Sequence, residues 1–261
     1  MLAWVREVSP NIAKCEISYL GRAAIDAALA VRQHRDYTNA LQALGCTLEW
    51  LAPLAQHPDG VFVEDTALLL PPVAILTRPG AASRRGETAS VAEALARQLP
   101  VLRISEPGCL DGGDVLLIER TLYVGASART NQAGISQLAQ ALDPFGYRVQ
   151  AVSLHGCLHL KSACTYIAPQ LLLVNPAWVD PAQFGCRVVI EVEEGEPYAA
   201  NTLTLGTTTL VSSAYPKTQR RLQAAGVRTH SLDVSELQKA EAALTCMSLL
   251  LGPAVAVKPL R

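Results

Sequence analysis

Chemically reactive side chains recur along this 261-residue chain at nearly constant intervals. Taking Asp65, Asp111, His159, Asn201 and Cys246 as markers, the intervals are 46, 48, 42 and 45 residues. Similar units repeated at this spacing would bring the five markers to a common axis. Because buried charges are costly unless they are paired or used, a polar centre in an apolar chain is typical of a functional site.

The segments between the markers repeat one pattern: an apolar strand, a turn, a helical segment and a second apolar strand. Short runs rich in Val, Ile, Leu and Thr predict strands, and apolar residues three and four positions apart predict helices. The predicted helices cover residues 23–44, 88–99, 132–142 and 218–225. The predicted strands cover residues 47–51, 73–77, 101–104, 121–125, 147–152, 171–174, 187–192, 209–212 and 227–232. Such a period favours a radial α/β array of five units, with α/β wrapping without symmetry as the alternative.

The composition is that of a globular protein, with 50% hydrophobic and 17% charged residues, and no linker divides residues 1–261 into domains. A net charge of −1 gives no reason to expect a nucleic-acid or membrane partner. The apolar runs are too short to span a bilayer, and no leader pattern opens the chain. Seven cysteines without CxxC pairs indicate reduced thiols rather than a disulfide framework. We therefore expect a cytoplasmic protein.

The marker residues together suit the hydrolysis of a guanidinium group. A thiolate is a strong nucleophile, and a histidine donates and accepts protons near neutral pH. Carboxylates match a planar guanidinium through forked hydrogen bonds. Cys246 would attack the central carbon, and His159 would serve both as the acid for the departing amine and as the base for water.

Seven sequence blocks resemble the dimethylarginine dimethylaminohydrolases, in the order of that family and with nearly its spacing. They are FVED (62–65), TRPGAASRRGE (77–87), LDGGDV (110–115), SARTN (127–131), LHLK (158–161), YAAN (198–201) and TCMS (245–248). Any one block is weak evidence, but seven in register are specific.

The resemblance implies a five-unit pseudo-symmetric α/β propeller (pentein fold), forming a single catalytic domain with its site at the centre. It implies conversion of Nω-methylated arginine to citrulline through a covalent cysteine thiouronium intermediate, without cofactor or metal, in a monomer or homodimer. The implied catalytic residues are Cys246, His159 and Asp111. The implied substrate-binding residues are Glu64 and Asp65 for the guanidinium, Arg84 and Arg129 for the α-carboxylate, Asp59 and the main chain of Ala240 for the α-amino group, and Leu20 on a lid.

One segment departs from the family pattern. Where the family usually has a small or β-branched residue followed by Asp-Gly, this chain has Ala240 followed by Glu241 and Ala242.

Other interpretations of these residues remain open from sequence alone. A sibling hydrolase acting on free arginine, like the arginine deiminases, would use the same chemistry. A non-catalytic arginine-binding module would keep the acids and arginines. His155, Cys157 and His159 would share one face of a strand and are ligand types for zinc. Asp111 and Asp114 could suggest calcium, but the spacing of a calcium loop is missing.

Overall fold

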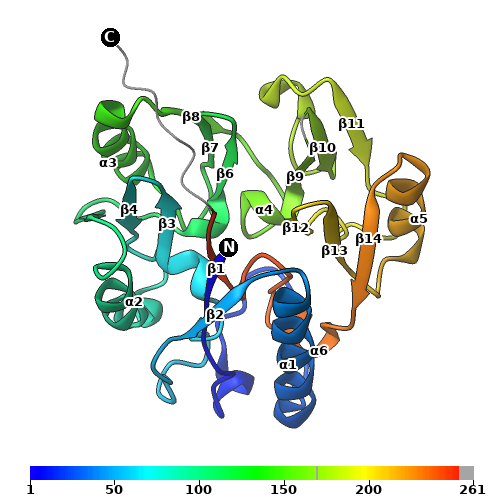
Figure 1. Cartoon of the computed structure of the whole chain (residues 1–261), viewed down its shortest axis with the longest axis horizontal. Helices are drawn as coiled ribbons and strands as arrows, with labels where there is room; N and C mark the ends of the chain where they lie inside the picture. Colours follow the sequence, from blue (N-terminus) through cyan, green and yellow to red (C-terminus); the bar gives the residue numbers. More distant parts are fainter. Residues whose placement is uncertain (169, 253–261) are drawn as a thin grey trace.

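Five small sheets form a ring in the computed structural model, which describes residues 1–168 and 170–252 (Figure 1). Each sheet has an inner, a middle and an outer strand. In every sheet the inner strand is antiparallel to the middle strand, and the middle strand is parallel to the outer strand. This common order confirms the predicted five-unit propeller and contradicts the alternative without internal symmetry.

The fifteen strands found in the described part of the chain fall into three sets. The middle strands are β1 (Leu2–Val5), β4 (Val73–Leu76), β7 (Thr121–Gly125), β10 (Leu171–Val174) and β13 (Thr208–Ser212). The outer strands are β2 (Thr47–Trp50), β5 (Val101–Arg103), β8 (Arg148–Val152), β11 (Val188–Glu191) and β14 (Arg228–Leu232). The inner strands are β3 (Ala67–Leu70), β6 (Val115–Ile118), β9 (Cys164–Ala168), β12 (Leu203–Leu205) and β15 (Leu249–Leu251).

The inner strands are absent from the sequence prediction, which assigned two strands to each of four units and one to the first unit, where the middle strand β1 was also missed. They begin shortly after the five marker residues, so each marker stands where the chain enters an inner strand. The first sheet takes its inner strand from the other end of the described chain, because β15 pairs with β1. This pairing closes the ring.

Parallel strands need a crossover connection, and helices supply it between the middle and outer strands of four units. These helices are α1 (Ala27–Ala43), α2 (Thr88–Leu95), α3 (Gln132–Leu142) and α5 (Pro216–Ala224). The fourth unit has only the short 3₁₀ helix η6 (Pro181–Phe184), as its short connection predicted. The other short helices are η1 (Ile12–Lys14), η2 (Val63–Thr66), η3 (Ala82–Glu87), η4 (Gly112–Asp114), η5 (Asp143–Phe145), α4 (Leu160–Ala163) and α6 (Ser235–Gln238).

Local chemistry explains where the helices begin and end. The prediction for α3 is confirmed at both ends, and Asn131 caps its first turn by accepting from the Gly134 amide. The predicted start of α1 at residue 23 is wrong, because the Asp26 side chain accepts from the Leu29 amide and begins the helix at Ala27. The predicted end of α2 at residue 99 is also too late; Pro100 follows, and a residue before proline disfavours helical geometry.

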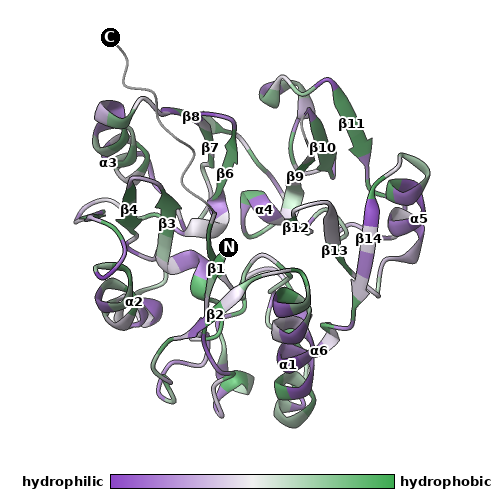
Figure 2. Ribbon diagram, in the orientation of Figure 1, coloured by the Kyte–Doolittle hydropathy of each residue, from purple (hydrophilic) through white to green (hydrophobic). Residues whose placement is uncertain are grey.

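Apolar packing joins neighbouring units. One cluster, for example, combines Ile75 of the second sheet with Val124 of the third and Leu138 of α3. Middle strands such as β4 and β10 are strongly hydrophobic, whereas the outer strand β14 is hydrophilic (Figure 2). Within residues 1–168 and 170–252, no helix combines the length and apolar character needed to cross a membrane.

Candidate active site

Two glycines allow the marker residues to approach one another at the axis. A Cβ atom on Gly112 would collide with the backbone oxygen of Glu64, and one on Gly113 would lie 2.7 Å from Nδ1 of His159. The Gly113 amide donates to Oδ1 of Asp65 at 2.9 Å. The glycines of the LDGGDV block therefore permit close backbone approach at the axis.

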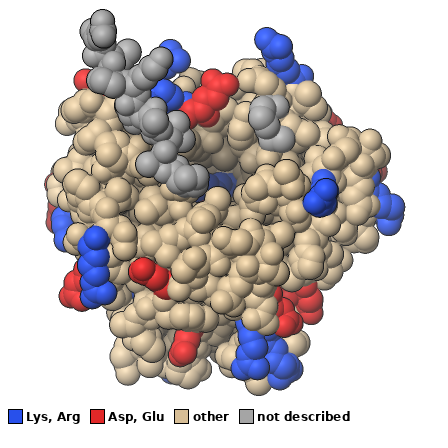
Figure 3. Space-filling model, viewed as in Figure 1, with Lys and Arg blue, Asp and Glu red and all other residues tan. Residues whose placement is uncertain are grey.

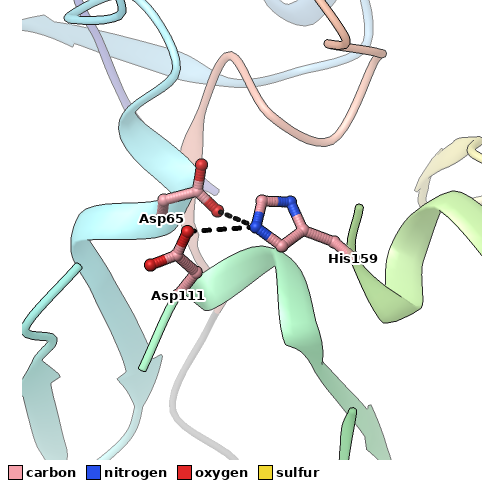
Figure 4. A group of neighbouring side chains, drawn as sticks. All are labelled: Asp65, Asp111 and His159. Atoms are coloured by element: carbon pink, nitrogen blue, oxygen red, sulfur yellow. Dashed lines mark hydrogen bonds and ion pairs between the residues drawn. The ribbon is translucent and has the colours of Figure 1, made fainter. Parts of the chain in front are cut away.

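Two aspartates from other units lie on the same side of His159 and face one nitrogen of its ring (Figure 4). Its Nε2 atom is 3.0 Å from Oδ2 of Asp111 and 3.9 Å from Oδ1 of Asp65. All three side chains are buried. Burial lowers the pKa of His159, but the charges of Asp65 and two further aspartates outweigh it and raise the pKa to about 9. The imidazole is therefore positively charged at neutral pH and able to donate a proton.

Asp65 is held in its ionised form by two cations. Burial raises the pKa of this carboxyl, but the charges of His159 and Arg84 outweigh burial and hold it at about 2. Arg84 Nη1 lies 2.5 Å from Asp65 Oδ2. Nε and Nη2 of Arg84 donate to the Glu87 carboxylate, and Nη2 also donates to the Phe62 carbonyl at 2.9 Å. Of the five N–H donors of this guanidinium, one on Nη1 has no bond among the described residues.

Cys246 lies in the loop between α6 and β15 and is half-buried. Its Sγ atom accepts from the Ala243 amide at 3.4 Å. Burial and the negative charges of Glu64 and Asp65 raise the pKa of the thiol to about 12. The sulfur is therefore neutral in the absence of a positively charged ligand.

A cavity of about 20 Å³ brings most of the predicted residues together. Its walls include seven of the ten predicted residues: Asp59, Asp65, Arg84, Arg129, His159, Ala240 and Cys246. They also include five that the sequence did not single out as site residues: Glu16, Phe62, Leu158, Glu241 and Ala242. A volume of this size has room for about one water molecule.

Three predicted residues do not line this cavity. Asp111 lies behind His159, to which it is bonded. Leu20 lines a neighbouring cavity of about 80 Å³. Glu64 lines a different cavity of about 420 Å³, which runs between the inner strands.

Glu64 is bonded to two residues that the sequence prediction did not include. Lys161 Nζ lies 2.7 Å from Glu64 Oε1, and the Thr245 hydroxyl donates to Oε2 at 2.7 Å. One face of the molecule has a hollow near its centre with a basic side chain at the bottom (Figure 3). The signal for Lys161 and Thr245 was present, since both belong to the blocks LHLK and TCMS. Their roles depend on contacts across the axis, which spacing does not reveal.

Two residues expected to bind the amino-acid end of a substrate, Asp59 and Arg129, instead contact the loop of residues 16–20. The Asp59 carboxylate accepts from the Glu16 amide at 3.1 Å, and burial raises its pKa to about 6. Arg129 Nη2 donates to the Ser18 hydroxyl at 2.9 Å. Both side chains are buried against this loop.

The geometry does not support the zinc site or the calcium site that the sequence left open. Residues 155–159 do not form a strand, and Gly156 has a positive φ of 68°. Among the described residues, the group of potential ligands is Asp65, Asp111 and His159, and it excludes His155 and Cys157. Asp114 accepts from the hydroxyls of Ser127 and Thr130 and from the Leu160 amide, so it supports the fold.

Comparison with known proteins gives consistent matches. A family model described as N,N dimethylarginine dimethylhydrolase, eukaryotic, matches residues 21–207. The N(G),N(G)-dimethylarginine dimethylaminohydrolase of Streptomyces coelicolor is 40% identical over 251 residues, covering 95% of this chain and 96% of the relative.

Solved structures agree with the sequence matches. A cysteine-to-serine variant of the Pseudomonas aeruginosa dimethylarginine dimethylaminohydrolase, complexed with citrulline, has a TM-score of 0.91 and 34% identity over 95% of this chain and 98% of its own. A histidine-to-glycine variant of a dimethylarginine dimethylaminohydrolase, as an adduct with S-methyl-L-thiocitrulline, has a TM-score of 0.90 and 35% identity at the same coverage.

Proposed function

Because this chain belongs to the dimethylarginine dimethylaminohydrolase family, we propose that it hydrolyses Nω,Nω-dimethyl-L-arginine to L-citrulline and dimethylamine. Nω-Methyl-L-arginine would give citrulline and methylamine by the same route. The observation that carries the assignment is the buried His159–Asp111 pair, which lies at a cavity also lined by Cys246 and Asp65.

Substrate charge activates the nucleophile in this proposal. The thiol of Cys246 is neutral because burial and the carboxylates of Glu64 and Asp65 raise its pKa. A guanidinium beside those carboxylates adds a positive charge, which favours the thiolate. Ionisation, with loss of the thiol proton to solvent, would therefore accompany binding of the cationic substrate.

The reaction then divides into two steps. In the first, Sγ of Cys246 bonds to the central guanidinium carbon, the bond to the methylated nitrogen breaks, and His159 donates a proton to the departing amine. The product of this step is a covalent thiouronium. In the second, His159, now neutral, accepts a proton from water while the water oxygen attacks the same carbon. The carbon–sulfur bond breaks, which releases citrulline and restores Cys246.

The amino-acid end of the substrate would bind the residues that the free protein uses to hold a loop. We assign the α-carboxylate to Arg129 and to the remaining Nη1 donor of Arg84. The α-amino group is assigned to Asp59 and the main chain of Ala240, with Leu20 on the covering loop. The burial of Asp59 and Arg129 against that loop supports this assignment.

The proposal treats residues 1–261 as one catalytic domain, of which 169 and 253–261 lie outside the described residues. It also includes a monomeric or homodimeric state and a cytoplasmic location. Seven free thiols suit a reducing compartment and support that location.

The test is citrulline release from dimethylarginine and from arginine, with wild type and Cys246→Ser. Cys186→Ser is the matched control, because Cys186 is also half-buried and has no assigned role. We expect release from dimethylarginine, abolished only by Cys246→Ser. Release mainly from arginine would favour the deiminase-like alternative, and release from neither substrate would contradict the proposal.

A further inference from the structure

Residues 16–20 form a loop beside the site cavity, and Glu16 lines that cavity. The Glu16 amide donates to Asp59, the Glu16 carboxylate accepts from the Ser83 hydroxyl, and the Ser18 hydroxyl accepts from Arg129. With the loop in this position the cavity measures about 20 Å³, which is far too small for an amino acid. The cavity must therefore enlarge before a substrate enters, and this loop forms part of its boundary.

The loop has a further partner, and this one lies beside the nucleophile. Three consecutive loop amides, those of Ser18, Tyr19 and Leu20, donate to the carboxylate of Glu241. The Ser18 bond measures 2.8 Å and the Leu20 bond 2.5 Å. Successive amides that converge on one anion form a nest, which is a favourable arrangement for a carboxylate.

The backbone of Glu241 has an unusual conformation. Its φ is 58°, in the left-handed region that residues other than glycine seldom adopt. Such a conformation persists where the surrounding structure holds it in place. Glu241 follows α6 and stands two residues before Ala243, whose amide bonds Cys246 Sγ. The contact therefore links the loop directly to the segment that holds the nucleophile.

A bound substrate would compete for some of the groups that hold the loop and leave others free of competition. An α-amino group would compete with the Glu16 amide for Asp59, and an α-carboxylate would compete with Ser18 for Arg129. The bonds from Glu241 use no group assigned to the substrate. Substrate binding would leave intact the contacts to Glu241 and the contact between Ser83 and Glu16, and of these two sets the contacts to Glu241 hold residues 18–20.

We propose that Glu241 is a positioning residue for the hydrolysis, whose carboxylate holds residues 18–20 closed over the bound substrate. The inference rests on the proposed function for its catalytic consequence, and on the structure alone for the loop contact.

Hydrogen exchange of the loop amides tests the contact without requiring turnover. Wild type, Glu241→Gln, Glu241→Asp and the exposed control Glu194→Gln would be compared, each with and without L-citrulline as the probe. In Glu241→Gln we expect the amides of residues 18–20 to exchange about 10-fold faster or more, because a neutral amide forms weaker bonds than a carboxylate. Glu241→Asp should fall between wild type and Glu241→Gln, and Glu194→Gln should match wild type.

Kinetics with dimethylarginine separate positioning from a structural role. Glu241→Gln should raise KM about 10-fold with kcat within about 3-fold of wild type, since the chemical groups are untouched. In Glu241→Asp, which keeps the negative charge, KM should return part of the way to the wild-type value. If Glu241→Gln does not fold, Tyr19→Pro removes one of the three donors from the opposite side and should change exchange and KM in the same direction.

Two results would overturn the inference. Unchanged exchange at residues 18–20 in Glu241→Gln would show that the carboxylate does not hold the loop. A raised KM with full amide protection would mean that Glu241 contacts the substrate itself. Failure of the proposed function would appear separately, as an absence of dimethylarginine hydrolysis in wild type with the exchange difference preserved.

Discussion

The Nε2 atom of His159 lies 3.0 Å from Oδ2 of Asp111, although the two residues are 48 positions apart in the chain. Asp111 also accepts from the Gly80 amide through its other oxygen, Oδ1, at 2.8 Å. Both carboxylate oxygens are therefore engaged, which fixes the carboxylate and with it the imidazole ring. The negative charges of Asp65 and Asp114, together with the hydrogen bond to Asp111 and its charge, explain how a buried histidine remains protonated at neutral pH.

Replacing Asp111 with Asn should lower the pKa of His159, because it removes a negative charge and a charge-assisted hydrogen bond. His159 must be protonated to donate to the leaving amine, so activity falls as pH rises through its pKa. The alkaline limb of kcat/KM should therefore move to lower pH, and kcat should fall by roughly 10²-fold or more. A pH–rate profile with the wild-type alkaline limb would remove Asp111 from this role.

The thiol of Cys246 should be neutral in the free protein until pH approaches about 12. Glu64→Gln removes a carboxylate that raises this pKa, so the thiolate should form at lower pH in that variant. The measurement is thiolate absorbance against pH. The absorbance of Cys246→Ser is subtracted, which removes the contribution of the other six cysteines. A thiolate already formed in the free wild type near neutral pH would contradict activation by substrate charge.

Arg129→Ala should raise KM for dimethylarginine strongly and affect a methylguanidine without an α-carboxylate far less. A charge-assisted hydrogen bond is worth roughly 1.5–3 kcal/mol, which corresponds to about a 10-fold to 100-fold change in binding. Steady-state kinetics with both substrates measure the difference. Equal losses for the two substrates would exclude Arg129 from carboxylate recognition.

Arg84→Ala should behave differently, because Arg84 neutralises the buried carboxylates of Asp65 and Glu87. Removing one partner of a buried ion pair costs about 3–5 kcal/mol, so the free energy of unfolding should fall by that order. Denaturant unfolding of Arg84→Ala beside Arg129→Ala gives the comparison. Similar free energies of unfolding in the two variants would contradict the prediction that Arg84 stabilises the fold.

Most of the fold was predictable because local patterns determine it. Helix α3 was predicted at both ends, since its cap and its apolar spacing lie within one segment. The inner strands were missed because each is short and follows the marker residues directly. Their assignment depends on pairing across the sheet, as in β15 with β1, and not on local preference.

The regular spacing and the ordered blocks were enough to predict that Cys246, His159 and the aspartates meet at the centre. How these groups are paired depends on the folded arrangement. Arg84 lies against Asp65 and Glu87, Glu64 against Lys161, and Glu241 against the loop amides. These pairings join segments far apart in the chain, and the partner of a charge depends on distance and burial, which spacing along a sequence does not contain.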